Sequence, residues 1–165
     1  MNKRSASTPA SHGMPLPVSS DRLERARRLC ESRGVQWTPL RAEVYALLVT
    51  HDAPLKAYDL LEKMREVHGR VAPMTVYRAL DFLVDQDLVH RVASTSSFVA
   101  CHEPGTAHHD PIFLVCQRCG TAQEWSRPRL SQSIQSEARR AGFAAHGAEI
   151  PGLCARCALP VRSGG

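Results

Sequence analysis

Apolar residues recur at intervals of three and four through residues 20–85, which is the spacing of amphipathic helices. Four such stripes predict four helices, which begin near Ser20, Pro39, Ala57 and Thr75. The second start is the strongest, because Thr38 offers a capping hydroxyl and a proline follows at the first helical position. Thr75 is the predicted cap of the fourth helix. Gly34 and Gly69 mark the ends of the first and third.

The apolar period changes to two after Asp87, which predicts a β-hairpin. Its strands are expected at Leu88–Ser94 and Ser97–Cys101, with Thr95-Ser96 as the turn. A hairpin closed in this way sets His90 opposite Cys101. Short helices followed by a hairpin are typical of a winged helix-turn-helix, so residues 20–102 are predicted to form such a domain.

A second module is predicted after a loop-like hinge at residues 103–110. Its expected elements are strands at Ile112–Val115 and Thr121–Trp125, a helix at Leu130–Ala141 and a strand at Phe143–Ile150. The fold class is therefore α+β, with an α/β domain over residues 111–160. Residues 1–19 are rich in serine and proline and read as a disordered tail, and residues 161–165 form a second tail.

Composition narrows the class of protein. The chain has 165 residues, 43% of them hydrophobic, which suits one medium domain or two small ones. No apolar run approaches the ~18 residues of a membrane span, and no apolar segment follows Lys3 and Arg4 as in a secretory signal. A cytoplasmic protein without a membrane partner is expected. The net charge of +5 is compatible with nucleic acid, but a motif must carry that argument.

Four of the six cysteines form two CxxC pairs, Cys116/Cys119 and Cys154/Cys157. Cysteines of a cytosolic chain are more often metal ligands or catalytic thiols than disulfides. Two thiolates three residues apart chelate one ion through a tight turn, and two such turns make the tetrahedral site of structural zinc. The alternatives are free or redox-active thiols. Four thiolates around Zn²⁺ give a tight, closed site that stabilises the fold.

A second constellation combines His90, Cys101, His109 and Glu124. Its charges cancel those of Zn²⁺, and it is anionic without metal, which suits a reversible regulatory site. The thiolate favours zinc over iron or manganese. Spacing alone leaves the ordinary alternatives open: a surface or core histidine, a cysteine acting as a small hydrophobe, and a solvated glutamate.

The fourth predicted helix carries polar groups beside its apolar face. Thr75, Tyr77 and Arg78 lie off the stripe and near the helix start, where they can meet a phosphate or a base edge. Arginine to guanine is the commonest specific base contact. The alternative is that Arg78 pairs with Asp81 or Asp85 on a solvated face.

Several motifs in one order resemble the ferric uptake regulator (Fur) family. They are Thr38-Pro39-x-Arg41, Ala57-Tyr58-Asp59-Leu60, the run from Thr75 to Leu83, and the two CxxC pairs. The chain is most similar to the family's zinc uptake regulator (Zur) branch, through Val89-His90-Arg91-Val92 and the run from Ser94 to His102.

The resemblance implies a winged-helix DNA-binding domain, a dimerisation domain and a homodimer on a palindromic operator. It implies two zinc ions per monomer, one structural and one regulatory. The structural ligands would be Cys116, Cys119, Cys154 and Cys157, and the regulatory ligands His90, Cys101, His109 and Glu124. The expected DNA contacts are Thr75, Tyr77, Arg78 and Arg41.

The expected function is a zinc-responsive transcriptional regulator that mainly represses zinc-uptake genes when zinc is bound. Iron or peroxide sensing is the alternative within the family. Iron-type members often carry a further histidine after His-His-Asp, whereas Pro111 follows His108-His109-Asp110 here, which weakens the iron interpretation. His109 rather than His108 is chosen only by counting back from Cys116. A zinc enzyme with a small-molecule substrate is not expected, because the deaminase and His-Glu-x-x-His patterns are absent. A zinc-stabilised protein-interaction module is the remaining rival.

Overall fold

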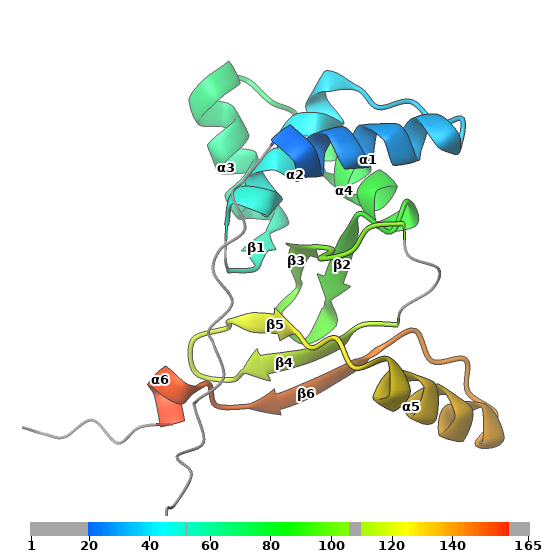
Figure 1. Ribbon diagram of the computed structural model, residues 1–165. Coiled ribbons are helices and arrows are strands. Elements are labelled where there is room, and N and C mark those ends of the chain that lie inside the picture. Colours follow the sequence, from blue (N-terminus) through cyan, green and yellow to red (C-terminus); the bar gives the residue numbers. More distant parts are fainter. Residues whose placement is uncertain (1–19, 52, 106–109, 159–165) are drawn as a thin grey trace, which may run out of the picture.

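The structure, a computed structural model, describes residues 20–51, 53–105 and 110–158 (Figure 1). The predicted tails and His109 lie outside the described residues. A helical layer, a small sheet and a second sheet follow one another along the molecule (Figure 1). The predicted α+β class is confirmed. No described helix is long and apolar enough to cross a membrane.

Four helices form the first layer: α1 (Ser20–Ser32), α2 (Pro39–Thr50), α3 (Ala57–His68) and α4 (Pro73–Asp85). The predicted cap of α2 is confirmed, since the Thr38 hydroxyl accepts a hydrogen bond from the Arg41 backbone N–H at 3.4 Å. The predicted cap of α4 is wrong. Ala72 is its N-cap, and Thr75 lies in the first turn, where its backbone N–H donates to the Ala72 carbonyl. Pro73 explains the earlier start, because its fixed φ suits the first helical position.

The helices pack around one apolar core. The stripes predicted from the sequence supply it: Leu60, Met64, Val76, Leu80 and Leu83 are among its buried side chains. The strand residues Val89 and Phe98 complete the core from the small sheet. The core therefore fixes α4 against the other helices and against the hairpin, while the polar side of α4 stays outside.

The predicted hairpin is present, as β2 (Val89–Val92) and β3 (Ser97–Ala100), and β1 (Leu55–Lys56) joins it in the order β1-β3-β2. The predicted pairing is wrong by two residues, because His90 stands opposite Val99 rather than Cys101. The connection is longer than a two-residue turn: the 3-10 turn η1 (Ala93–Thr95) is followed by Ser96 in the left-handed region, at φ 52°. A shift of two keeps every side chain on its predicted face.

The second sheet contains β4 (Ile112–Cys116), β5 (Ala122–Glu124) and β6 (Ala148–Gly152), in the order β5-β4-β6. β6 runs parallel to β4, and α5 (Pro128–Arg140) lies in the crossover between β5 and β6. The short helix α6 (Ala155–Ala158) ends the described chain.

The strand predicted from Phe143 begins five residues later, at Ala148. Gly147 explains the delay, because its φ of +118° breaks an extended run. A Cβ there would also lie 2.7 Å from the Pro111 carbonyl oxygen, so the chain passes Pro111 too closely for a side chain.

The side chains on the two faces of the hairpin pack into two different hydrophobic cores. Val89 and Phe98 face the helices, whereas Val92 packs with Phe113, Val115 and Ala122 of the second sheet. Side chains alternate along a strand, so neighbouring residues of one hairpin reach both modules. The hairpin, which we call the wing (residues 89–100), thus lies between the helical layer and the second sheet (Figure 1).

Candidate metal centres and nucleic-acid interface

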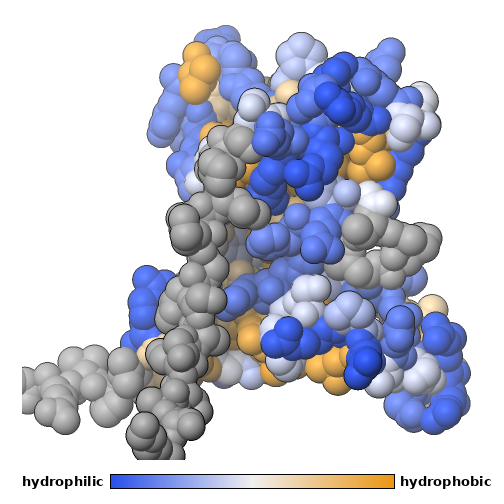
Figure 2. Space-filling view, in the orientation of Figure 1, coloured by the Kyte–Doolittle hydropathy of each residue, from blue (hydrophilic) through white to orange (hydrophobic). Residues whose placement is uncertain are grey.

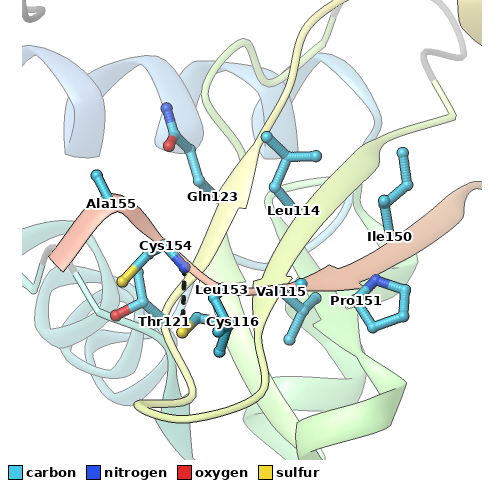
Figure 3. Close-up of a pocket in the computed structure, with 11 residues that line it drawn as sticks. Leu114, Val115, Cys116, Thr121, Gln123, Ile150, Pro151, Leu153, Cys154 and Ala155 are labelled. Atoms are coloured by element: carbon cyan, nitrogen blue, oxygen red, sulfur yellow. Dashed lines mark hydrogen bonds between the residues drawn. The ribbon is translucent and has the colours of Figure 1, made fainter. Parts of the chain in front are cut away.

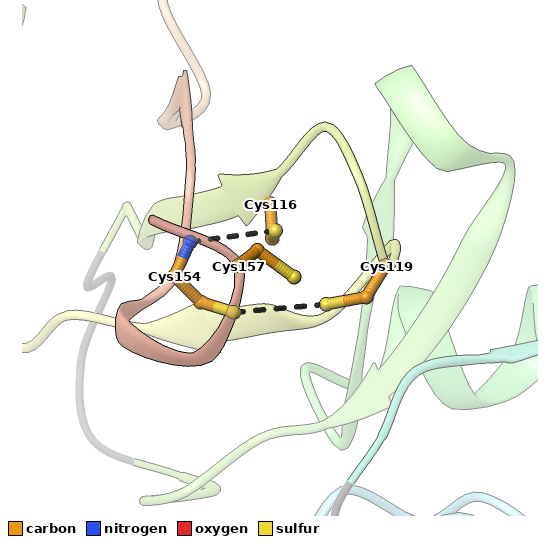
Figure 4. A group of neighbouring side chains, drawn as sticks. All are labelled: Cys116, Cys119, Cys154 and Cys157. Atoms are coloured by element: carbon orange, nitrogen blue, oxygen red, sulfur yellow. Dashed lines mark hydrogen bonds between the residues drawn. The ribbon is translucent and has the colours of Figure 1, made fainter. Parts of the chain in front are cut away.

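The four cysteines of the CxxC pairs, which we call the four-cysteine cluster, converge at one end of the second sheet (Figure 4). Cys116 ends β4, and Gly120, at φ 72°, closes the turn that brings Cys119 back. The four sulfur atoms lie within 4.8 Å of one another, and those of Cys119 and Cys154 are 3.8 Å apart. Zinc–sulfur bonds of about 2.3 Å in a tetrahedron set the sulfurs about 3.8 Å apart. The four-cysteine cluster therefore fits a zinc ion.

Hydrogen bonds prepare part of the four-cysteine cluster for metal. The Cys154 backbone N–H donates to the Cys116 sulfur at 3.4 Å. Together with the Cys119 N–H it lowers the pKa of Cys116 to about 5. The Thr121 side chain lowers the pKa of Cys119, whereas the bond with the Cys154 thiol raises the pKa of Cys157 to about 12. Metal ligation requires thiolates, so a cation that binds this cluster displaces the thiol protons that remain, that of Cys157 among them.

A groove borders the four-cysteine cluster on the outer face of the second sheet (Figure 3). Most of its walls are apolar, and Leu114, Ile150 and Leu153 are exposed there. In the space-filling view, apolar surface shows at the level of this sheet, while the helical layer above is largely hydrophilic (Figure 2). The groove thus belongs to an exposed apolar face.

Three residues of the second constellation also converge, from two modules. His90 lies on β2, Cys101 follows β3, and Glu124 ends β5. Their ligand atoms lie within 4.8 Å of one another. The corrected pairing permits this because His90 and Cys101 remain diagonal neighbours on one face of the wing. We call these three residues the mixed cluster.

The chemistry of the mixed cluster fits a divalent cation. Cys101 is fully buried, and burial, with the nearby Glu124 carboxylate, raises the pKa of the thiol to about 12. The thiol is therefore protonated without metal, and a cation that binds there exchanges for its proton. The Arg22 guanidinium donates to the Cys101 carbonyl at 2.9 Å, which ties this strand end to α1.

The polar side of α4 is open to solvent. Tyr77 is 46% exposed and Arg78 is exposed, while Thr75 is half-buried. Within the part of the chain that the structure describes, Arg78 forms no ion pair with Asp81 or Asp85, so that alternative is not supported. The exposed guanidinium and phenol suit contacts to a nucleic acid.

Arg41, a further expected DNA contact, also makes contacts within the helical layer. Its guanidinium lies 3.5 Å from the centre of the Phe82 ring and donates to the Gln36 carbonyl. A cation over an aromatic ring is held by the ring's negative face. Arg41 therefore joins α2 to α4, and it is half-buried beside the polar side of α4.

Sequence reasoning assigned no role to Tyr58, although it lies within a quoted motif. Its side chain is 64% exposed in the first turn of α3. The available signal was its position beside, rather than on, the stripe formed by Ala57, Leu60 and Leu61. Like Tyr77 on α4, the exposed Tyr58 on α3 gives the helical layer an aromatic group that can stack or form a hydrogen bond.

Comparison with known proteins gives consistent matches. The model of the ferric uptake regulator family matches residues 32–151. The zinc uptake regulation protein of Escherichia coli (strain K12) is 39% identical over 146 residues, which cover 87% of this chain and 85% of that protein. A solved structure of a zinc uptake regulator complexed with zinc and DNA is 38% identical, covers 86% of this chain and 95% of its own, and has a TM-score of 0.77.

A third relative, XcZur, has been solved in two states. Its holo structure is 40% identical, covers 85% of this chain and 99% of its own, and has a TM-score of 0.74. Its apo structure is 41% identical, covers 84% and 97%, and has a TM-score of 0.50. Since the sequence likeness is nearly equal, the difference lies in arrangement, and this chain is nearer the holo arrangement.

Proposed function

The chain belongs to the ferric uptake regulator family, and we propose that it is a zinc-responsive, sequence-specific DNA-binding regulator that mainly represses zinc-uptake genes when zinc is bound. The observation that carries the proposal is the mixed cluster, in which His90 of the wing and Cys101, which directly follows the wing, meet Glu124 of the second sheet. The likeness to zinc uptake regulators over most of the chain supports it. The family is one of regulators, not a class of enzymes.

We assign one zinc ion to each cluster. The structural ion would be held by Cys116, Cys119, Cys154 and Cys157. The regulatory ion would be held by His90, Cys101 and Glu124, with His109 as the fourth ligand. A thiolate, a carboxylate and two neutral imidazoles balance the charge of Zn²⁺, and the thiolate disfavours iron and manganese. The iron or peroxide alternative is therefore not favoured.

A regulatory ion would act on DNA binding through the wing. Its ligands would join the wing to the second sheet, and the wing shares the core that holds α4. An occupied site would thus fix the direction of α4, which carries the proposed DNA contacts Thr75, Tyr77 and Arg78, with the fourth, Arg41 of α2, packed on Phe82. Coupling of this kind is reciprocal and typically about 1–3 kcal/mol.

The exposed apolar face of the second sheet supports a homodimer. Leu114, Ile150 and Leu153 are 37–50% exposed there, although large apolar side chains gain free energy when they are buried. Residues 111–160 would then form the dimerisation domain and residues 20–102 the DNA-binding domain, with 103–110 as the hinge. A two-fold symmetric dimer suits a palindromic operator.

Zinc titration tests the function directly. Protein purified without added metal should retain about one zinc ion per chain in the four-cysteine cluster. In a zinc-buffered assay with promoter DNA, filling the second site should raise the affinity by about 5- to 150-fold. The rise should be absent for random DNA of equal length. Equal binding with zinc and with chelator would contradict a zinc-responsive regulator and favour a zinc-stabilised interaction module.

Replacing Arg78 with alanine should relax sequence preference. Loss of an arginine contact to one base costs about 1–3 kcal/mol, and the cost falls on that position of the operator. Competition between the operator and variants mutated at single positions would measure it. Arg139→Ala is the matched control, because it removes the same charge from an exposed site on α5. Equal losses on every sequence would instead identify Arg78 as a phosphate contact.

A further inference from the structure

The tip of the wing is held by a carboxylate of the second sheet. Glu149, on β6, accepts hydrogen bonds from the backbone N–H groups of Ala93 at 2.6 Å and Ser94 at 3.1 Å, one on each oxygen. These donors open the 3-10 turn η1, and the first N–H groups of such a turn have no partner inside it. The carboxylate thus caps the turn as an N-cap side chain would, but from 55 or 56 positions away in sequence.

The charge of Glu149 makes this cap stronger than a neutral one. Burial works against its ionisation, but the Ser94 side chain and the two backbone donors outweigh burial and lower its pKa. The carboxylate is therefore ionised near neutral pH. Hydrogen bonds to an ionised acceptor are about twice as strong as those between neutral groups.

Contacts between the wing and the second sheet extend from one end of β2 to the other. The mixed cluster includes His90, near the start of β2, while Val92, which ends β2, is buried against Phe113, and the Glu149 bonds follow at Ala93. At about 3.3 Å per strand residue, His90 and Ala93 are about 10 Å apart. One attachment leaves a rigid hairpin free to pivot, whereas two separated attachments fix its direction.

We propose that Glu149 is a positioning residue that latches the wing tip to the second sheet, so that Glu149 and the mixed cluster together set the direction of α4 for DNA binding. The wing tip would then serve as a strut between the modules rather than as a DNA contact, because its first N–H groups are occupied within the protein. The proposal rests on the proposed function for its link to DNA, but not for the contact itself.

Glu149→Gln tests the latch in the full chain loaded with zinc. The variant keeps the size of the side chain but removes its charge, and its amide N–H₂ would oppose one of the two donors. We expect the Ala93 and Ser94 amides to lose about ten- to a hundredfold of their protection from hydrogen exchange in NMR spectra. Strand amides of β2 and β3 and the zinc content should stay unchanged. At saturating zinc, operator affinity should fall by about tenfold, which lies within the usual range of coupling between two sites.

Glu137→Gln is the matched control, since it removes the same charge from an exposed side chain of α5 that pairs with Arg140. It should leave amide protection and operator affinity unchanged. Small-angle scattering supplies a readout independent of DNA: the distance distribution should broaden for Glu149→Gln alone.

The outcomes separate the latch from the proposed function. If Glu149→Gln loses the amide protection but binds the operator as tightly as the wild type, the latch is overturned while the function stands. Wild-type protein without zinc-dependent DNA binding would overturn the function. The latch is then decided by scattering, where an unchanged distance distribution for Glu149→Gln would overturn it too.

Discussion

Replacing Cys101 with serine should abolish the zinc response of DNA binding and leave a folded protein. Serine is close to cysteine in size, so the buried position stays filled. Its hydroxyl remains protonated and is a poor zinc ligand, since structural and catalytic zinc sites use thiolate, imidazole and carboxylate donors. Zinc should therefore fall by one ion per chain, and the coupling of about 1–3 kcal/mol between zinc and DNA should disappear.

Cys30→Ser provides a matched control for this experiment. Cys30 is also fully buried, and burial raises the pKa of its thiol, but it lies on α1 away from both clusters. Cys30→Ser makes the same chemical change as Cys101→Ser. Any loss of stability that both variants share is therefore the cost of burying a hydroxyl group. Only Cys101→Ser should lose the second zinc ion. A Cys101→Ser protein that shifts operator DNA with the zinc dependence of the wild type would remove Cys101 from the regulatory site.

The likeness to the holo form of XcZur agrees with the contacts of the wing. The mixed cluster, the packing of Val92 and the Glu149 hydrogen bonds all join the wing to the second sheet. Because the Glu149 bonds need no metal, they would hold the wing against the second sheet before any ion binds. Under the proposed function, zinc would then have fewer degrees of freedom to order, and its affinity for the mixed cluster would rise.

Local signals predicted most of the fold. Apolar stripes located the four helices, and Thr38-Pro39 located the start of α2 to the residue. The paired cysteines predicted the four-cysteine cluster because two tight turns bring sulfurs together whatever the rest of the fold does. The mixed cluster was also anticipated, although the hairpin pairing behind it was wrong, because an even shift leaves His90 and Cys101 on one face.

Contacts between residues far apart in the sequence could not be predicted from its local patterns. The commitment of Arg41 to Phe82 depends on how α2 crosses α4, and the cap that Glu149 places on η1 depends on where β6 lies beside the wing. Neither pair has a spacing that a helix or strand period reveals. The late start of β6 has a similar cause, since Gly147 passes close to Pro111, which precedes β4.

Replacing Cys116 with serine should have the largest effect, because it removes a ligand of the structural site. Structural zinc sites contribute about 10–16 kcal/mol of binding free energy, and a whole domain is stabilised by only about 5–15 kcal/mol. The second sheet also has little apolar core of its own, since its buried cluster depends on Val92 of the wing. We therefore expect the second module to unfold, with loss of both zinc ions and of the dimer.

Light scattering after size exclusion, circular dichroism and metal analysis would measure these losses together. Gln117→Ala is the matched control: it alters the neighbouring exposed residue in the same turn, whose backbone N–H bonds to the Gly152 carbonyl and is retained. This control should keep two zinc ions per chain and the wild-type melting temperature. The helical layer of Cys116→Ser should remain folded, because the buried residues of its core, among those that the structure describes, include none from the second sheet. A Cys116→Ser protein that stays a stable dimer with full zinc content would show that the four-cysteine cluster does not stabilise the fold.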